Sequence, residues 1–287
     1  MVKKFLAVFT ALSIPFLSSC SELNALFLSQ KEIPADSTGL NVYFLDVGQA
    51  DSTFIECDGE KMMIDGGNVG DSSYVVSFLK KQNMEHLKYV FGTHGHEDHI
   101  GGLSGALSQC TADSVFCSSD KYSSKAFKNF AAKAETASSG ITIPNVGDTY
   151  SLGSSTITVL GPVEKSENEN DNSIVLKLDY GNTSFIFTGD AEFEEEKSII
   201  ESGAYLDADV LKVGHHGSST SSSYRFLREV MPDYAVISVG KDNTYGHPHE
   251  ETLSRLSDEG ASIYRTDKSG IIQIHSDGNE ISVFTER

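Results

Sequence analysis

Three histidines, a glutamate and an aspartate are concentrated in residues 94–99, which read HGHEDH. Neutral imidazoles and a carboxylate are ligands that suit Zn²⁺, Mn²⁺ or Fe²⁺. The segment follows a short apolar run and precedes the flexible pair Gly101-Gly102, so it should form a tight loop at the end of a strand. In such a turn, residues two apart can converge on one ion while the interleaved residues serve a second. The candidate ligands are His94, His96, Asp98 and His99.

Two later clusters contain further histidines. His215 and His216 are adjacent, so their side chains should diverge where the chain is extended; one is expected to bind metal and the other to pack or to contact substrate. His247, which precedes Pro248, is a candidate either for donating a proton to a leaving group or for binding a phosphate oxygen. For His249 we predict an N-terminal helix position.

A serine-rich stretch, GSSTSSS, directly follows the histidine pair. Its hydroxyls and backbone amides could cradle a phosphate group, which makes Ser218 a candidate substrate contact. The sequence contains no serine nucleophile elbow, P-loop or dinucleotide-binding fingerprint that would indicate another kind of active site than a metal centre.

The elements that must position these residues alternate between strands and helices in two similar halves. We expect strands over 40–47, 52–57, 61–65, 87–93, 154–162, 173–181, 183–190, 208–218, 233–240, 262–267, 270–278 and 280–285, and helices over 72–84, 191–203 and 249–260. This order of strands and helices indicates one α/β domain over 40–287, with two packed sheets and helices outside. Glu194, Glu195 and Glu196 are assigned to a solvated helix face.

Taken in order, the motifs resemble those of the metallo-β-lactamase fold, whose H-x-H-x-D-H motif is matched by residues 94–99. The resemblance implies a four-layer αββα sandwich with a two-metal site at one edge. A narrower resemblance covers nearly all of residues 40–287. LDVGQADS, THGHEDHIGG, NDNSIVLKL, FTGD, LKVGHHGSSTS and NTYGHP are similar to motifs of the hydrolase domain of ComEC-type DNA-uptake proteins, and bacterial phosphorylcholine esterases look similar too.

The family resemblance implies a role for each candidate residue. His94 and His96 would bind the first ion, and Asp98 and His99 the second. Asp190, from FTGD, would bridge both ions, and Asp65, from MMIDGG, would hold the metal ligands in place without binding an ion itself. A late histidine completes the second site; alignment with the family favours His215 over His216.

The sequence departs from the family pattern at two places. It has no histidine between His99 and Asp190, so the usual third ligand of the first ion is missing. Asn172, in the corresponding stretch, either faces the site or only shapes a turn. We therefore expect one tightly held ion and one exchangeable ion. His96 stands where ComEC-type domains often carry aspartate, which favours zinc, with manganese as the alternative.

The resemblance implies a hydrolase in which two bridged ions lower the pKa of a water molecule from about 16 towards neutral. We expect a phosphodiesterase, nuclease-like or phosphorylcholine-esterase-like, with Asp98, Asp190 and His247 as catalytic residues. The formal charge of −19 disfavours long DNA and favours a small or short phosphodiester, although Lys212, Arg225 and Lys241 are candidate cations for the cleft. The alternatives are a β-lactamase or other acyl hydrolase, and a non-catalytic surface binding protein.

The first residues have the pattern of a secretory signal: Lys3 and Lys4, then an apolar stretch, then small residues. The sequence LSSC resembles the lipobox of bacterial lipoproteins, which implies a signal peptide over 1–19, a lipidated Cys20 and a tether over 20–39. The protein is therefore expected outside the cytoplasm, lipid-anchored to a bacterial membrane. The remaining three cysteines give no complete disulfide framework; Cys110 and Cys117 are either paired or buried thiols.

Replacing Cys20 with alanine tests the lipid anchor. Because lipidation at Cys20 would hold the chain on the membrane, Cys20→Ala should either release the protein or leave it unprocessed. Membrane fractionation and the mass of the intact protein measure both outcomes. Unchanged fractionation together with an unchanged mass would contradict the lipobox.

Overall fold

The computed structural model describes residues 38–287. The predicted signal peptide, Cys20 and nearly all of the predicted tether lie outside the described residues. Within residues 38–287, no helix has the length and apolar character needed to cross a membrane.

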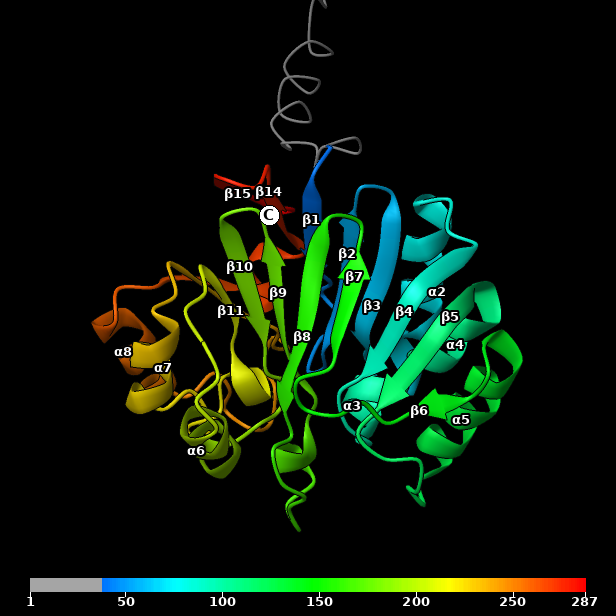
Figure 1. Cartoon of the computed structure of the whole chain (residues 1–287), viewed down its shortest axis with the longest axis horizontal. Helices are drawn as coiled ribbons and strands as arrows, with labels where there is room; N and C mark the ends of the chain where they lie inside the picture. The colour runs from blue at the N-terminus through cyan, green and yellow to red at the C-terminus, as the bar shows by residue number, and fades with distance from the viewer. Residues whose placement is uncertain (1–37) are drawn as a thin grey trace, which may run out of the picture. The chain divides into compact units, whose positions relative to one another are not determined.

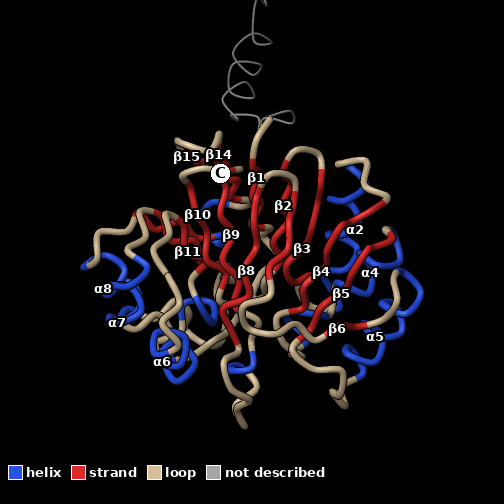
Figure 2. The backbone as a smooth tube through the Cα atoms, in the orientation of Figure 1, coloured by secondary structure: helices blue, strands red, loops and turns tan. Residues whose placement is uncertain are grey.

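The described residues form two β-sheets that pack face to face (Figures 1 and 2). The first sheet has the order β15-β14-β1-β2-β3-β4-β5-β6, and the second has the order β13-β12-β11-β10-β9-β8-β7. The strands of the first sheet are β1 (Leu40–Phe44), β2 (Ser52–Cys57), β3 (Glu60–Gly66), β4 (His86–Gly92), β5 (Thr111–Cys117), β6 (Ile141–Thr142), β14 (Ile272–Ser276) and β15 (Ile281–Thr285). Those of the second are β7 (Thr149–Leu152), β8 (Ser155–Gly161), β9 (Val175–Tyr180), β10 (Thr183–Phe187), β11 (Val210–Lys212), β12 (Tyr234–Ile237) and β13 (Ser262–Arg265).

Helices cover the outer face of each sheet, which produces four layers (Figure 1). The first sheet is covered by α2 (Ser72–Lys81), α4 (Leu103–Gln109) and α5 (Lys125–Ala137), with the short α3 (Glu97–Ile100) beside them. The second is covered by α6 (Phe193–Glu201), α7 (Tyr224–Val230) and α8 (Glu250–Asp258), and α9 (Thr266–Ser269) follows β13. Single 3₁₀ turns are η1 (Val69–Asp71) and η2 (Asn170–Asn172), whereas the short segment η3 (Gly214–Gly217) contains two residues with a left-handed backbone.

Alternation along the strands creates the separate core layers. In β1, Val42 and Phe44 point into the layer between the two sheets, whereas Tyr43 packs on the outer layer against Phe78 of α2. Successive side chains of a strand point to opposite faces, so a strand that is buried on both faces is apolar throughout. The rings of Phe91 and Phe116, 4.5 Å apart, are among those that fill the layer between the sheets.

The predicted four-layer αββα class is confirmed, and each expected strand and helix has a counterpart. No expectation covered residues 103–153, where the structure has α4, α5 and three strands. Ser124, whose Oγ accepts a hydrogen bond from the backbone N–H of Phe127 at the start of α5, was an available N-cap signal. The expected strand over 208–218 was too long, because β11 ends at Lys212 and the chain then turns.

The assignment of the α6 glutamates to a solvated face was wrong for two of the three. Glu195 and Glu196 are only 3% and 2% exposed. Glu195 accepts a hydrogen bond from the backbone N–H of Val163 at 2.8 Å, and Glu196 accepts from the backbone N–H groups of Ser222 and Ser223. Burial raises the pKa of Glu195 to about 8 and that of Glu196 to about 7. These carboxyls join α6 to neighbouring loops.

The buried Glu195 should make stability depend on pH. Its carboxyl keeps a proton in the folded chain up to a pKa of about 8, against an ordinary value of 4.5. This contribution is therefore complete below pH 4.5 and is lost as the pH rises toward 8, at up to about 1.4 kcal/mol per pH unit. Glu195→Gln keeps the carbonyl acceptor for Val163 but does not ionise, so its urea unfolding free energy should fall less between pH 5 and 8. Parallel curves for the two proteins would refute the assignment.

Candidate metal centre

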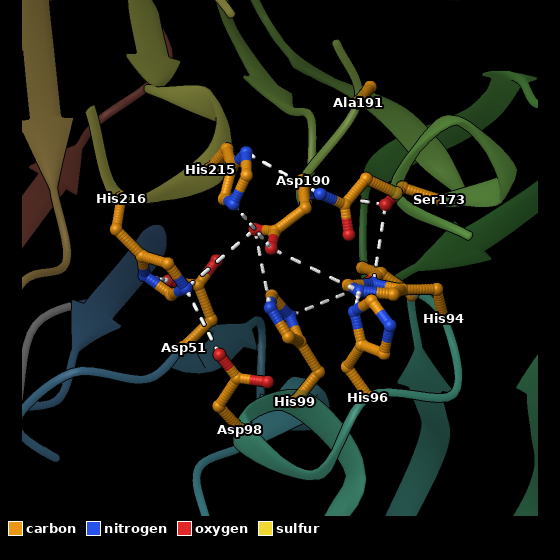
Figure 3. A network of polar contacts seen from close by, with 12 residues as sticks. Asp51, His94, His96, Asp98, His99, Ser173, Asp190, Ala191, His215 and His216 are labelled. Carbon is orange, nitrogen blue, oxygen red and sulfur yellow. Dashed lines mark hydrogen bonds and ion pairs between the residues drawn. The ribbon is translucent and has the colours of Figure 1, made fainter. Parts of the chain in front are cut away.

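The sequence-predicted histidines and aspartates converge where strands of both sheets end (Figure 3). The loop after β4 supplies His94 and His96, the short helix α3 that follows it supplies Asp98 and His99, and the loop after β10 supplies Asp190. The histidine pair of η3 follows β11, which runs parallel to β10. Carboxyl ends of parallel strands are where ligands commonly bind in α/β folds, because loops from several strands meet there.

The carboxylate of Asp190 lies at the centre of this cluster, and its two oxygens face different histidines. Oδ1 lies 3.2 Å from Nε2 of His99 and 3.8 Å from Nε2 of His216. Oδ2 lies 3.9 Å from Nε2 of His215 and 4.0 Å from Nε2 of His94. Asp190 is thus placed as the bridge between two sites.

Asp98 and His96 extend the cluster toward solvent. Asp98 Oδ2 lies 3.5 Å from Nε2 of His216, and a third of the Asp98 side chain is exposed. His96 is exposed, and its Nδ1 lies 2.9 Å from Nε2 of His94. All four ligand candidates from residues 94–99 therefore reach the site, two buried and two closer to its surface.

Buried polar groups fix the orientation of the innermost rings. Nδ1 of His99 donates to Asp65 Oδ2 at 2.8 Å, and Nδ1 of His216 lies 3.0 Å from the carbonyl oxygen of Ser238. Ser173 Oγ lies 3.3 Å from Nδ1 of His94. Because each Nδ1 is occupied, each Nε2 is left to face Asp190. The predicted supporting role of Asp65 matches this geometry.

Facing charges shift the acid–base behaviour of the cluster strongly. Burial alone would raise the pKa of Asp190, but His99 and His216 outweigh it and lower that pKa well below its ordinary value. Burial alone would lower the pKa of His216, but Asp190 and Asp51 raise it to about 10. Burial, reinforced by the charge of His99, lowers the pKa of His94 well below its ordinary value. Buried groups with such shifts are typical of functional sites.

The chemistry of the donor set fits divalent metal ions. The ligand atoms of His94, His99 and Asp190 lie within 4.8 Å of one another, and the same holds for those of Asp98, His99 and His216. Nε2 of His99, Oδ1 of Asp190 and Nε2 of His216 are buried and have no hydrogen-bond partner. Buried polar atoms are normally paired, so atoms left unpaired around a shared space are those that a bound ion would satisfy.

The geometry favours His216 over His215, the residue preferred from the sequence, at the second site. It is His216 whose Nε2 lies beside Asp98 and Asp190 Oδ1, while His215 faces the other oxygen, Oδ2. The preference came from alignment with the family, which does not show that both residues have left-handed backbones, with φ of 48° and 53°. That turn sends the two rings to different sides of Asp190.

His247 lines the pocket above the cluster. The side-chain N–H of Gln49 lies 3.3 Å from Nδ1 of His247, and Oε1 of Gln49 accepts from the backbone N–H of Gly240. The second contact fixes the Gln49 amide, so Nδ1 of His247 is an acceptor and Nε2 carries the proton. Burial and then the neighbouring His215 lower the pKa of His247 to about 4. As predicted, His249 is a helix N-cap, that of α8.

The pocket has a volume of about 290 Å³, and every side chain that lines it carries a polar group. It is lined by Gln49, His96, Glu97, Asp98, Asn170, Asp190, His215, His216, Tyr245 and His247. None of these residues is aliphatic, and none is a lysine or an arginine.

Two predicted contacts and three predicted cations do not line this pocket. Asn172 shapes a turn, because its amide bonds to the backbone of Ser166 and Asn168. Ser218 is buried, its Oγ bonds to Thr220, and its carbonyl accepts from Thr252. The cations are engaged elsewhere or lie outside the lining: Lys212 pairs with the buried Asp51 at 2.7 Å, Arg225 lies near Glu201, and Lys241 is exposed.

Two side chains from the outer helices, Arg255 and Glu196, hold the loop that follows the histidine pair. Arg255 of α8 donates to the carbonyl oxygens of Ser219, Ser221 and Ser222, while Glu196 of α6 accepts from backbone N–H groups in the same loop. The serine-rich segment is therefore a held structural loop, and its hydroxyls are not those of an open phosphate cradle.

Sequence reasoning missed several residues that lie beside the histidines of the cluster and of the pocket. They are Asp51, which lies 3.3 Å from Nδ1 of His216, Ser173 beside His94, Gln49 beside His247, and Glu192, whose Oε1 lies 3.0 Å from Nδ1 of His215. Gln49 and Asp51 fall inside the motif LDVGQADS, which was a usable signal. Glu192 had none, because it sits in a run of helix-starting acids.

Comparison with known proteins is consistent with this geometry. A family model described as "Metallo-beta-lactamase superfamily" matches residues 45–241. The chain is 30% identical over 275 residues to ComE operon protein 3 of Bacillus subtilis, covering 88% of this chain and 35% of that protein. It is 29% identical to Competence protein ComA of Neisseria gonorrhoeae, covering 84% of this chain and 33% of that protein. The resemblance to ComEC-type proteins is confirmed.

The chain spans about a third of the length of the curated relatives it matches. Among solved structures, the metallo-beta-lactamase fold protein YhfI of Bacillus subtilis aligns with a TM-score of 0.54 at 13% identity, covering 82% of this chain and all of that one. That similarity concerns the fold alone.

Replacing Asp65 with asparagine should weaken metal binding without disturbing the fold. Asparagine tolerates the left-handed backbone at this position, where φ is 58°, and keeps an acceptor for the N–H of Thr93. Its amide nitrogen would face Nδ1 of His99 and favour the tautomer with the proton on Nε2, which cannot bind metal. Zn²⁺ affinity, measured by competition with a chromogenic chelator, should fall 10–100-fold. Asp113→Asn, at an exposed site on β5, serves as the control, and equal affinities in both variants would rule out this role.

Proposed function

The chain belongs to the metallo-beta-lactamase superfamily, and on that premise we propose that this metal-dependent hydrolase is a phosphodiesterase for small or short phosphodiesters. The character of the pocket supports the proposal best. Its lining has no aliphatic side chain to receive the apolar portion of an acyl substrate. It offers imidazole, amide and carboxylate groups, which match a compact polar group such as a phosphodiester.

We assign the following roles to the residues of the site. His94, His96, Asp98, His99, Asp190, His215 and His216 would hold two divalent ions, which when bound supply Lewis acidity and lower the pKa of a water molecule. Asp98, partly exposed at the pocket, orients the attacking water as an acceptor. His247, neutral and protonated on Nε2, donates a hydrogen bond to a phosphoryl oxygen. This supports the second of the two roles left open for His247, binding over proton donation.

The charges around the pocket favour a short substrate over long DNA. No lysine or arginine lines the pocket, whereas Glu97, Asp98 and Asp190 do. Non-specific affinity for DNA comes mostly from lysine and arginine contacts to phosphates. An anionic substrate therefore depends on the bound metal ions for its attraction, and binding should require them.

The extracytoplasmic location and the lipid anchor remain part of this proposal. They rest on the sequence pattern around Cys20, which lies outside the described residues. The names of the two relatives, ComE operon protein 3 and Competence protein ComA, suggest a link with competence. We propose for this chain the hydrolytic step alone, because the relatives are about three times as long.

A substrate panel tests the proposal on the full-length protein loaded with Zn²⁺ or Mn²⁺. Bis-p-nitrophenyl phosphate and p-nitrophenyl phosphorylcholine should be hydrolysed, single-stranded DNA weakly at most, and nitrocefin not at all. Removing the metal with a chelator should abolish both turnover and the binding of inorganic phosphate. Nitrocefin hydrolysis without phosphodiester turnover would favour the acyl hydrolase, and metal binding without any turnover the non-catalytic protein.

His247→Ala tests the role given to that ring. Losing one hydrogen bond to a charged group costs about 1.5–3 kcal/mol, so kcat/KM for bis-p-nitrophenyl phosphate should fall about 10–100-fold. Metal content should not change, because His247 is not placed as a ligand. His86→Ala, at an exposed position on β4, is the matched control. A His247→Ala enzyme with full kcat/KM would contradict the assignment.

A further inference from the structure

The backbone of the adjacent pair His215-His216 is unusual. Both residues are in the left-handed region, with φ of 48° and 53°, between Gly214 and Gly217. A left-handed conformation costs roughly 1–2 kcal/mol for a residue with a side chain. Two successive costs of this kind persist only where the surroundings demand that geometry, as they do at many functional sites.

The result of that geometry is that two neighbouring rings reach opposite oxygens of one carboxylate (Figure 3). His216 joins His99 at Oδ1 of Asp190, at 3.8 and 3.2 Å. His215 joins His94 at Oδ2, at 3.9 and 4.0 Å. In an extended chain the two rings would point away from each other, and only one could reach Asp190.

A carboxylate orients His215 toward Asp190. Glu192 Oε1 lies 3.0 Å from Nδ1 of His215, and Glu192 is itself held by the side-chain amides of Asn168 and Asn170. Metal-binding histidines commonly donate their second N–H to a carboxylate, which fixes the tautomer and the ring. Asp65 stands in the same relation to His99, which gives both histidines the arrangement expected of ligands.

From these contacts we propose that His215 is the third histidine of the first metal site, together with His94, His96 and the bridging Asp190, and that Glu192 is its positioning residue. The chain has no histidine between His99 and Asp190 that could fill this place. This inference rests on the metal centre of the proposed function and is independent of the phosphodiester substrate.

The spacing of the ligand atoms also makes the two sites unequal. Two ligands of one tetrahedral ion at ordinary bond lengths lie about 3.3–3.5 Å apart. At the second site, the contacts of Asp190 and Asp98 with the histidines are 3.2, 3.5 and 3.8 Å. At the first site, the contacts of Asp190 Oδ2 are 3.9 and 4.0 Å, and a quarter of the His215 side chain is exposed. Because His96 is exposed and His215 partly exposed, whereas His99 and His216 are buried, we expect the first site to be the more exchangeable one.

Paired variants of the full-length protein show whether His215 belongs to the first or to the second metal site. Each protein is stripped with a chelator, titrated with Zn²⁺ and with Co²⁺, and scored by ions per chain and by Co²⁺ absorption. His94→Ala and His215→Ala should each lose the same weaker ion, so the double variant should still retain one tightly bound ion. The double variant of His215 and His216 to alanine should lose both ions.

The opposite pattern would overturn the proposal. If His215 served the second site, the His215 and His216 double variant would keep one ion, and the His94 and His215 double variant would lose both. Two ions of unchanged affinity in His215→Ala would overturn it as well. Glu192→Gln, which keeps the ligand itself, should weaken only the first site by 10–100-fold, and unaltered binding would count against its positioning role.

Two controls and two further outcomes separate other causes. Thermal unfolding in chelator checks that each variant folds, and His86→Ala should match the wild type in every readout. Loss of phosphodiester turnover with the predicted ion pattern intact would contradict the substrate proposal alone. A folded wild-type chain that binds no Zn²⁺ or Co²⁺ would overturn the metal centre and this inference together.

Discussion

The carboxylate of Asp190 is the interaction on which the rest of the site depends. It is 3% exposed and is faced by four imidazoles, two at each oxygen. A buried carboxylate is costly unless its charge is compensated, and here the compensation comes from rings that carry their own buried partners. With one carboxylate between two groups of histidines, ions held by the two groups would lie on either side of Asp190.

Neither sheet could build this arrangement alone. Asp190 and the histidine pair follow strands of the second sheet, whereas His94 and His99 follow β4 of the first. The buried pair of Asp51 and Lys212, at 2.7 Å, ties a loop of the first sheet to β11 of the second, close to His216. Breaking such a pair on one side typically costs about 3–5 kcal/mol, because the remaining charge is left buried and unpaired. The relative position of the two sheets is therefore held by charge as well as by apolar packing.

The sequence predicts well what depends on local pattern and motif order. Short apolar runs located β1 and β4, and the residue types and spacing of His94, His96, Asp98 and His99 identified the candidate metal ligands. It could not order His215 and His216, because that order depends on two successive left-handed residues, which non-glycine residues rarely adopt. Nor could it separate Glu195 from exposed Glu194, because both stand in one acidic run and only tertiary packing buries one of them.

The loop held between Arg255 and Glu196 links the metal centre to the outer helices. These two side chains, from α8 and α6, fix the backbone that directly follows His216. Assembly of the ligands therefore requires the second sheet to be fully packed, and by linkage any ion that binds only the folded chain stabilises that packing in return. Ambient metal thus sets the persistence of the protein as well as its activity. Under metal starvation a larger fraction of molecules would be unfolded, and proteolysis would remove them first.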